Sequence, residues 1–203
     1  MAADKPQAAP ERVTLYEVKG EEYMYCPIRK RTYKVTNKPE EKVRQWWLYQ
    51  LRDHYGYSFD RIGVEVPVKV GSSEAKKKAD IVVYTDKTKR FPRIFVEVKK
   101  QNRTDGLDQL EVYMNATGCR LGLWSNGGPS NVYLLRIEPA EGQEEASWRE
   151  LRNIPSANEK LEDVDSPITR AHLAPVEDFL SILRECEDHI KAHEGVNVFD
   201  EIL

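Results

Sequence analysis

Two short apolar runs, each rich in Val, Ile, Phe and Tyr, flank a polar stretch between residues 76 and 100. Runs of this kind, separated by Thr, Asp and Pro, predict two consecutive strands joined by a turn. Because successive side chains alternate between the two faces of a strand, Glu97 and Lys99 point to the same side of the second strand. Asp80 opens the first strand. We therefore expect Asp80, Glu97 and Lys99 to lie together.

The apolar pattern also predicts the neighbouring elements. Residues 37–56 repeat apolar positions every three or four residues, which predicts a helix with Asn37 as N-cap and Gly56 at its end. Residues 62–70 alternate, which predicts a strand with its Ile and Val side chains on one face and Glu65 on the other. This strand and the two strands predicted between residues 76 and 100 together predict an antiparallel three-strand meander. A helix at 106–117 and strands at 120–124 and 132–137 follow.

The two ends of the chain differ from this central part. Residues 1–36 predict a tail and one or two short strands. Residues 139–174 are acidic and punctuated by proline, which predicts an irregular linker. Residues 175–203 predict a C-terminal amphipathic helical segment, and the apolar pattern that stops there without a cap favours a piece of a longer chain.

Composition is typical of a soluble globular protein. The 203 residues, 40% of them apolar, suffice for one domain and an appendage. The sequence has no apolar run of membrane-spanning length and no apolar signal core, so we expect a cytoplasmic protein without a membrane partner. Its 3 cysteines are scattered without ligand spacing, which argues against disulfides and a zinc site.

Charge is distributed unevenly along the chain. The net charge is only -3, yet Lys and Arg outnumber Asp and Glu in residues 76–103, whereas acids dominate residues 138–203. A basic segment around the candidate site suits a polyanionic substrate, because phosphate neutralisation supplies most nonspecific DNA affinity. The predicted DNA contacts are Lys76, Lys77, Lys78, Lys100 and Arg103.

The trio of Asp80, Glu97 and Lys99 suits one kind of chemistry. Two carboxylates that converge from adjacent strands form the hard, all-oxygen site that Mg²⁺ prefers. A lysine beside it orients or deprotonates a water molecule and offsets charge in the transition state, which predicts phosphodiester hydrolysis. For an isolated Glu-x-Lys, an ion pair between strands is the alternative. Glu65 is a candidate auxiliary acid, with an exposed position as its alternative.

An Asp that opens one strand and a Glu-x-Lys near the end of the next form the signature of the PD-(D/E)xK nuclease superfamily. The wording KADIVVY and FVEVKK resembles the N-terminal nuclease domain of type I restriction enzyme R subunits, although Ala79 stands where the signature has proline. The resemblance implies that Asp80, Glu97 and the Val98 carbonyl hold Mg²⁺, for which Mn²⁺ can substitute, and that Lys99 positions the water.

Two further motifs extend this resemblance over residues 39–127. PEEKVRQ resembles the family's first motif, in which a helix glutamate faces the site; the helical spacing favours Glu40, with Glu41 second and Arg44 in an unassigned role. QLEVYM resembles the family's QxxxY motif, which implies that Gln109 and Tyr113 support the lysine and the substrate phosphate.

We therefore expect an α/β fold with a restriction-endonuclease-like core over residues 37–138, ordered helix, three-strand antiparallel meander, helix and strand, and a helical C-terminal appendage. The implied function is a Mg²⁺-dependent endonuclease of a type I-like restriction-modification system that cuts foreign double-stranded DNA beside methyltransferase, specificity or helicase modules. The alternatives are a non-catalytic DNA- or subunit-docking module on the same fold, and a structure-specific or RNA nuclease.

Overall fold

The computed structural model describes residues 9–71, 77–139, 141–142, 145–165 and 183–184. The chain divides into two compact units, Met1–Asp165 and Ser166–Leu203. The amphipathic helix expected within 175–203 therefore lies almost wholly outside the described residues, as does most of the expected N-terminal tail. In the described part of the chain, no helix is long and apolar enough to cross a membrane.

A six-stranded mixed sheet forms the centre of the first unit, in the order β4-β5-β6-β7-β8-β9. Its strands are β4 (Ile62–Val68), β5 (Lys77–Tyr84), β6 (Pro92–Val98), β7 (Leu121–Ser125), β8 (Val132–Ile137) and β9 (Ser147–Leu151). The expected meander is confirmed, since β4, β5 and β6 pair antiparallel. β7 pairs parallel to β6, and α2 (Leu107–Thr117) supplies the crossover that a parallel pair requires.

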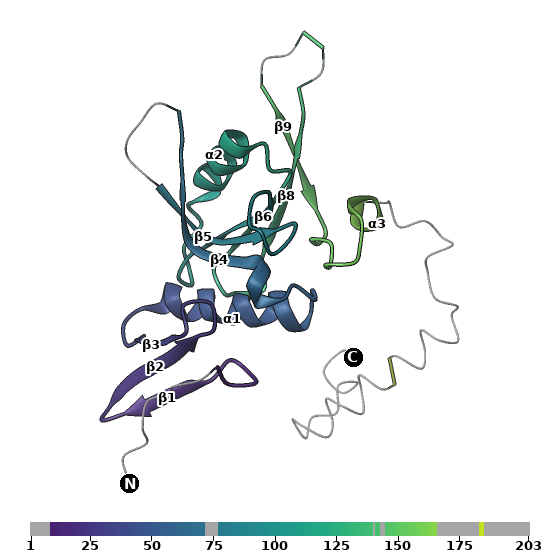
Figure 1. Ribbon diagram of the computed structural model, residues 1–203. Coiled ribbons are helices and arrows are strands. Elements are labelled where there is room, and N and C mark those ends of the chain that lie inside the picture. Colours follow the sequence, from purple (N-terminus) through teal and green to yellow (C-terminus); the bar gives the residue numbers. More distant parts are fainter. Residues whose placement is uncertain (1–8, 72–76, 140, 143–144, 166–182, 185–203) are drawn as a thin grey trace, which may run out of the picture. The chain divides into compact units, whose positions relative to one another are not determined.

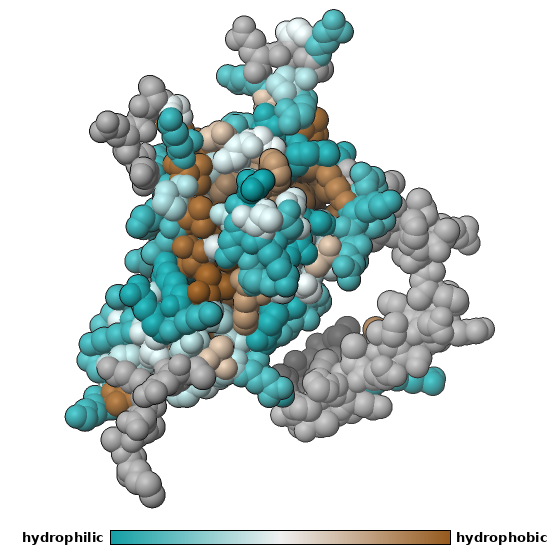
Figure 2. All heavy atoms as spheres, in the orientation of Figure 1, coloured by the Kyte–Doolittle hydropathy of each residue, from teal (hydrophilic) through white to brown (hydrophobic). Residues whose placement is uncertain are grey.

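The helices α1 (Pro39–Asp53) and α2 cover opposite sides of this sheet (Figure 1). On one side, Trp47, Leu48 and Leu51 of α1 pack in a core with strand residues such as Ile81 and Val96. On the other side, α2 contributes Leu110, Tyr113 and Met114 to a second core. Figure 2 shows hydrophilic residues over most of the described surface of one face, with hydrophobic residues gathered along β4 and β5.

β4 departs from the simple alternation that its sequence predicts. Ile62 and Val64 pack in the α1-side core, whereas Val66 and Val68 pack in the α2-side core. Glu65 lies between them with φ 49°, and this left-handed residue reverses the alternation. The expectation that all the Ile and Val side chains share one face is therefore wrong.

β5 shows the same reversal directly opposite. Ala79 belongs to the α2-side core and Ile81 to the α1-side core, although residues two apart share a face in a regular strand. Glu65 and Asp80 lie between the ladder pairs Val64–Ile81 and Val66–Ala79. Asp80 thus lies at an irregular point within β5, and not at its start as expected.

A separate three-stranded antiparallel sheet precedes α1. It consists of β1 (Leu15–Val18), β2 (Glu21–Cys26) and β3 (Arg31–Lys34), where the sequence predicted one or two strands. Gly20, with φ 74°, lies in the turn between β1 and β2. Cys26, Ile28 and Tyr33 join the α1-side core, so this sheet packs against the core of the same unit.

The structure of residues 139–165 differs from the irregular linker that the sequence predicted. They contain β9, which pairs with β8, and a short helix α3 (Leu161–Asp165). Leu151 and Ile154 are buried in the α1-side core. The hydroxyl groups of two tyrosines that follow α1 donate hydrogen bonds to this segment, from Tyr55 to Asn153 Oδ1 at 2.6 Å and from Tyr57 to the Pro155 carbonyl at 2.8 Å. This segment is therefore part of the domain core.

Candidate active site

The strands β5 and β6 bring the predicted trio into one cluster. The Val98 N–H donates a hydrogen bond to Asp80 Oδ2 at 2.9 Å, which fixes the aspartate against the end of β6. Lys99 Nζ lies 2.6 Å from Glu97 Oε1. Phe95 packs in the α2-side core while Ile94, Val96 and Val98 pack on the other side, so β6 alternates as the sequence predicts.

Glu97 is the most deeply buried acid of the cluster, with 2% of its surface exposed. Burial and the nearby charge of Asp80 raise the pKa of Glu97 to about 7, while Lys99 and Arg44 act in the opposite direction. Burial acts to lower the pKa of Lys99, but the hydrogen bond and charge of Glu97 outweigh it and raise that pKa. Lys99 is therefore a protonated donor at neutral pH.

Arg44 of α1 connects the helix to the same cluster. Its Nη2 lies 2.5 Å from Asp80 Oδ1, its Nη1 donates a hydrogen bond to Glu41 Oε2, and Nη1 lies 3.7 Å from Glu65 Oε1. The arginine is 8% exposed, and burial alone would lower its pKa. The charges of Asp80 and Glu41 outweigh burial and raise the pKa of Arg44, so this guanidinium holds Asp80 in place.

The first turn of α1 faces the cluster through Glu41, whereas the helical spacing favoured Glu40. Glu41 Oε1 accepts a hydrogen bond from Gln45 Nε2 at 2.7 Å, and both Arg44 and Gln45 are buried. Residues 41, 44, 45 and 48 form a stripe on α1 that packs inward, and Glu40 lies outside it and is exposed. Glu40 is nonetheless close enough for its charge to contribute to the raised pKa of Lys99.

Gln109 and Tyr113 of α2 support β5. Gln109 Nε2 lies 2.5 Å from the Tyr113 hydroxyl, which donates a hydrogen bond to the Lys78 carbonyl at 3.0 Å. Burial and the charge of Glu97 raise the pKa of Tyr113 to about 12, so its hydroxyl stays protonated. The pair thus holds the backbone two residues before Asp80, and its direct hydrogen bonds go to β5, not to Lys99.

The predicted cations occupy two places. Lys77 and Lys78 begin β5 and are exposed, and Lys76 lies outside the described residues. Lys100 and Arg103 line a polar cavity of about 400 Å³ at the start of α1; its other lining residues are Asn37, Lys38, Pro39, Glu40, Glu41 and Arg44. Arg103 Nε also lies 2.5 Å from Asp105 Oδ1. The cavity therefore opens beside the carboxylate cluster and mixes both signs of charge.

Comparison of the sequence with known protein families identifies the family of the chain. The family described as "Type I restriction enzyme R protein N terminus (HSDR_N)" matches residues 39–155, more than half of the 203 residues. The chain belongs to this family. No curated protein and no solved structure matches it. The matched HSDR_N region runs from the first residue of α1 to beyond β9, so it includes the complete large sheet and all of the carboxylate cluster.

The HSDR_N cluster fits a hard cation in one respect. Glu97 Oε2 is buried and has no hydrogen-bond partner, although Lys99 satisfies the other oxygen. A buried carboxylate oxygen without a partner is costly, and a cation would satisfy it. Within the described ranges, no group of three or more His, Cys, Asp or Glu side chains gathers as a metal site.

The structure adds two residues to the HSDR_N site that sequence reasoning missed. A Cβ at Gly106, which has φ 103° and precedes α2, would lie 2.5 Å from Lys99 Cε. Glycine is therefore what lets the chain pass over the lysine. Arg29, from the turn before β3, forms an ion pair with Glu65. The only sequence signal for Gly106 is that a glycine precedes a helix. The role of Arg29 follows only from the fold.

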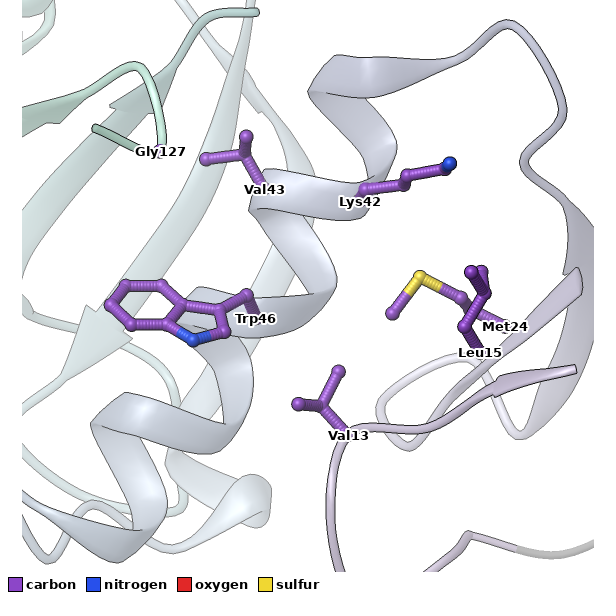
Figure 3. Close-up of a pocket in the computed structure, with 7 residues that line it drawn as sticks. All are labelled: Val13, Leu15, Met24, Lys42, Val43, Trp46 and Gly127. Atoms are coloured by element: carbon purple, nitrogen blue, oxygen red, sulfur yellow. The ribbon is translucent and has the colours of Figure 1, made fainter. Parts of the chain in front are cut away.

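The turn at Gly127 packs on α1. A Cβ at Gly127 would lie 2.7 Å from Val43 Cγ2. Beside it is an apolar cavity of about 360 Å³ between α1 and the N-terminal sheet (Figure 3). Figure 3 shows Val43 and Trp46 projecting from α1 on one side of this cavity and Met24 and Leu15 on the other. None of these residues belongs to the carboxylate cluster.

Proposed function

We propose that this HSDR_N chain is a Mg²⁺-dependent endonuclease domain of a type I-like restriction-modification system, which hydrolyses phosphodiester bonds of foreign double-stranded DNA. The observation that carries the proposal is the cluster of Asp80, Glu97 and Lys99, in which the buried Oε2 of Glu97 has no hydrogen-bond partner. The order of α1, the antiparallel meander, α2 and a parallel strand supports a PD-(D/E)xK, restriction-endonuclease-like core.

The cation would be held by Asp80, Glu97 and the Val98 carbonyl, with Mn²⁺ able to substitute for Mg²⁺. When bound there, it would lower the pKa of a water molecule and withdraw charge from a phosphate oxygen. The remaining chemistry belongs to the side chains of this domain. Overall, a new bond forms from the water oxygen to phosphorus and one ester P–O bond breaks. The attacking water gives up a proton to the solvent, and the departing ester oxygen takes up a proton and leaves as a hydroxyl group.

Lys99 is the proposed catalytic cation. Because Glu97 keeps its ammonium protonated, Lys99 donates a hydrogen bond that orients the water, and its charge offsets the negative charge that develops on the phosphate. Arg44 and Glu41 position Asp80 from α1, and Gln109 and Tyr113 position β5 from α2. Glu40, on the wall of the polar cavity, is a second candidate helix acid.

The test compares wild-type protein with Lys99→Ala on supercoiled and linear duplex DNA, with Mg²⁺, with Mn²⁺ and with chelator. We expect metal-dependent nicking that falls by about 10²-fold or more in the variant, as for loss of an electrostatic catalytic group. Lys69→Ala, which removes an exposed lysine just after β4, is the matched control, and we expect it to keep activity.

Two results would overturn the proposal. Equal nicking by wild type and Lys99→Ala would place the chemistry elsewhere. No nicking by the wild type with either metal would leave the non-catalytic docking module. Branched DNA and RNA substrates in the same assay separate a structure-specific nuclease and an RNA nuclease from the proposed activity. We further expect methyltransferase, specificity or helicase modules in the cytoplasm to supply site recognition.

A further inference from the structure

The turn between β2 and β3 and the start of β3 carry a concentrated positive charge. Residues 27–34, named here the basic hairpin, read PIRKRTYK and contain no acid. They precede residue 39, where the HSDR_N match begins, so the family comparison assigns them no role. The family resemblance and the motifs it rests on also lie outside this segment.

Ion pairs place the basic hairpin beside the carboxylate cluster. Arg29 pairs with Glu65, Glu65 lies 3.7 Å from Arg44, and Arg44 bonds Asp80. The hairpin is therefore connected to a proposed metal ligand through two side chains. DNA whose backbone lies at Asp80 would pass within reach of this turn.

The basic hairpin is held against the core and is not a free loop. Ile28 and Tyr33 pack on the α1-side core. The guanidinium of Arg31 lies 4.6 Å, and that of Arg29 5.3 Å, from the centre of the Tyr33 ring, in cation–π contacts. This packing fixes the cations in advance, which lowers the entropy lost when a ligand binds.

The cations at the tip of the hairpin have no acidic partner. Lys30 and Arg31 are exposed, and neither forms an ion pair within the part of the chain that the structure describes. Elsewhere around this sheet Lys34 pairs with Glu21, and Lys42 of α1 pairs with Glu22. Lys19, at the opposite end of β2, is exposed and, like Lys30, has no ion pair within the described residues.

We infer that the basic hairpin binds the phosphate backbone of DNA next to the bond that Asp80, Glu97 and Lys99 cleave. The inference rests on the proposed function and adds a second set of phosphate contacts to Lys100 and Arg103. Lys30 and Arg31 contact phosphates, and Arg29 ties the hairpin to Glu65. Such contacts orient the duplex without reading its sequence.

The chain offers a matched control for Lys30. Lys19 occupies the β1–β2 turn with φ 54°, and Lys30 occupies the β2–β3 turn with φ 50°. The two turns lie at opposite ends of β2, roughly 20 Å apart for a strand of this length. Lys30→Glu and Lys19→Glu therefore change the net charge and the backbone strain equally and differ in their distance from the cluster.

The experiment measures binding of a fluorescent duplex by anisotropy at several salt concentrations, in a Lys99→Ala background so that the DNA stays intact. We expect Lys30→Glu to weaken binding by about tenfold and to reduce the slope of log affinity against log salt by about one or more, while Lys19→Glu stays within about twofold of the parent. Thermal melts of both variants check that each is folded.

Equal effects of the two variants would overturn the inference, because net charge alone would then explain them. Unchanged binding by Lys30→Glu would also overturn it and leave an acidic protein as the partner of the hairpin. Cleavage by the wild type is measured separately. If the wild type binds DNA more tightly than Lys30→Glu but cuts none, the nuclease proposal fails, whereas the inference that the basic hairpin binds DNA is supported. If no DNA is bound at all, both fail.

Discussion

At the scale of single residues, the cluster is unfavourable when only protein atoms satisfy it. Glu97 is almost fully buried and Lys99 satisfies one of its two oxygens, which leaves the other without a hydrogen bond. Arg44 neutralises Asp80 but not Glu97 Oε2. Strongly shifted acids of this kind concentrate at functional sites.

Gly106 offers a prediction at this scale. In Gly106→Ala the new Cβ would contact Lys99 Cε and lie 3.3 Å from Nζ, so the ammonium must move. Small displacements of catalytic groups reduce rates by as much as 10²-fold. We expect a similar loss of DNA nicking, measured under the conditions of the Lys99→Ala assay.

Gly118→Ala is the control for this prediction. Gly118 ends the same helix with φ 68°, and a Cβ there would have nothing within 4 Å. Both variants should lose about 1–2 kcal/mol of unfolding free energy from the left-handed backbone, but only Gly106→Ala should lose activity. Full activity in a folded Gly106→Ala protein would show that this glycine does not position Lys99.

At the scale of elements, sequence patterning predicted the meander, both helices and β7, because strand alternation and helical spacing are strong where one face is buried. Patterning could not predict the reversal at Glu65, since a non-glycine residue at positive φ leaves no compositional signal.

The sequence pattern favoured Glu40 over Glu41 because the stripes through 40, 43 and 47 and through 41, 44 and 48 are neighbours on α1. It missed β9, whose residues SWREL are mostly polar and become a strand by pairing with β8.

The irregular point at Glu65 gives the prediction for this scale. Glu65 is a partly exposed acid, so its ion pairs with Arg29 and Arg44 contribute at most about 1 kcal/mol. Its left-handed backbone costs a side-chain residue about 1 kcal/mol relative to glycine. We expect Glu65→Gly to be more stable than Glu65→Ala by about that amount in urea unfolding, because both lose the carboxylate and only glycine tolerates φ 49°.

The same two variants test Glu65 as an auxiliary acid. If it only ties the N-terminal sheet to β4, both variants keep most of their nicking activity in excess DNA. A matched loss of activity in the two, beyond about tenfold at saturating DNA, would instead assign Glu65 to the chemistry.

At the scale of the whole molecule, the folded unit extends beyond the HSDR_N match at both ends. The match covers residues 39–155, whereas the first compact unit spans Met1–Asp165. The N-terminal sheet contributes Cys26 to the α1-side core, and the segment after β8 contributes Leu151 and Ile154. The acidic, proline-containing sequence after residue 138 therefore has two parts, of which the first completes the core.

Truncation tests this division. A chain ending at Asp165 keeps the complete first unit, whereas one ending at Glu138 loses β9, two buried aliphatic side chains and the partners of the Tyr55 and Tyr57 hydroxyls. Burial of each aliphatic side chain is worth about 1.5–3 kcal/mol and each hydrogen bond about 1 kcal/mol. The sum is comparable with the whole stability of a typical domain, about 5–15 kcal/mol.

We expect 1–165 to unfold cooperatively at the temperature of the full chain, and 1–138 to lack a cooperative transition in calorimetry. A cooperative 1–138 would return residues 139–165 to the status of a linker, and a destabilised 1–165 would show that residues 166–203 support the first unit.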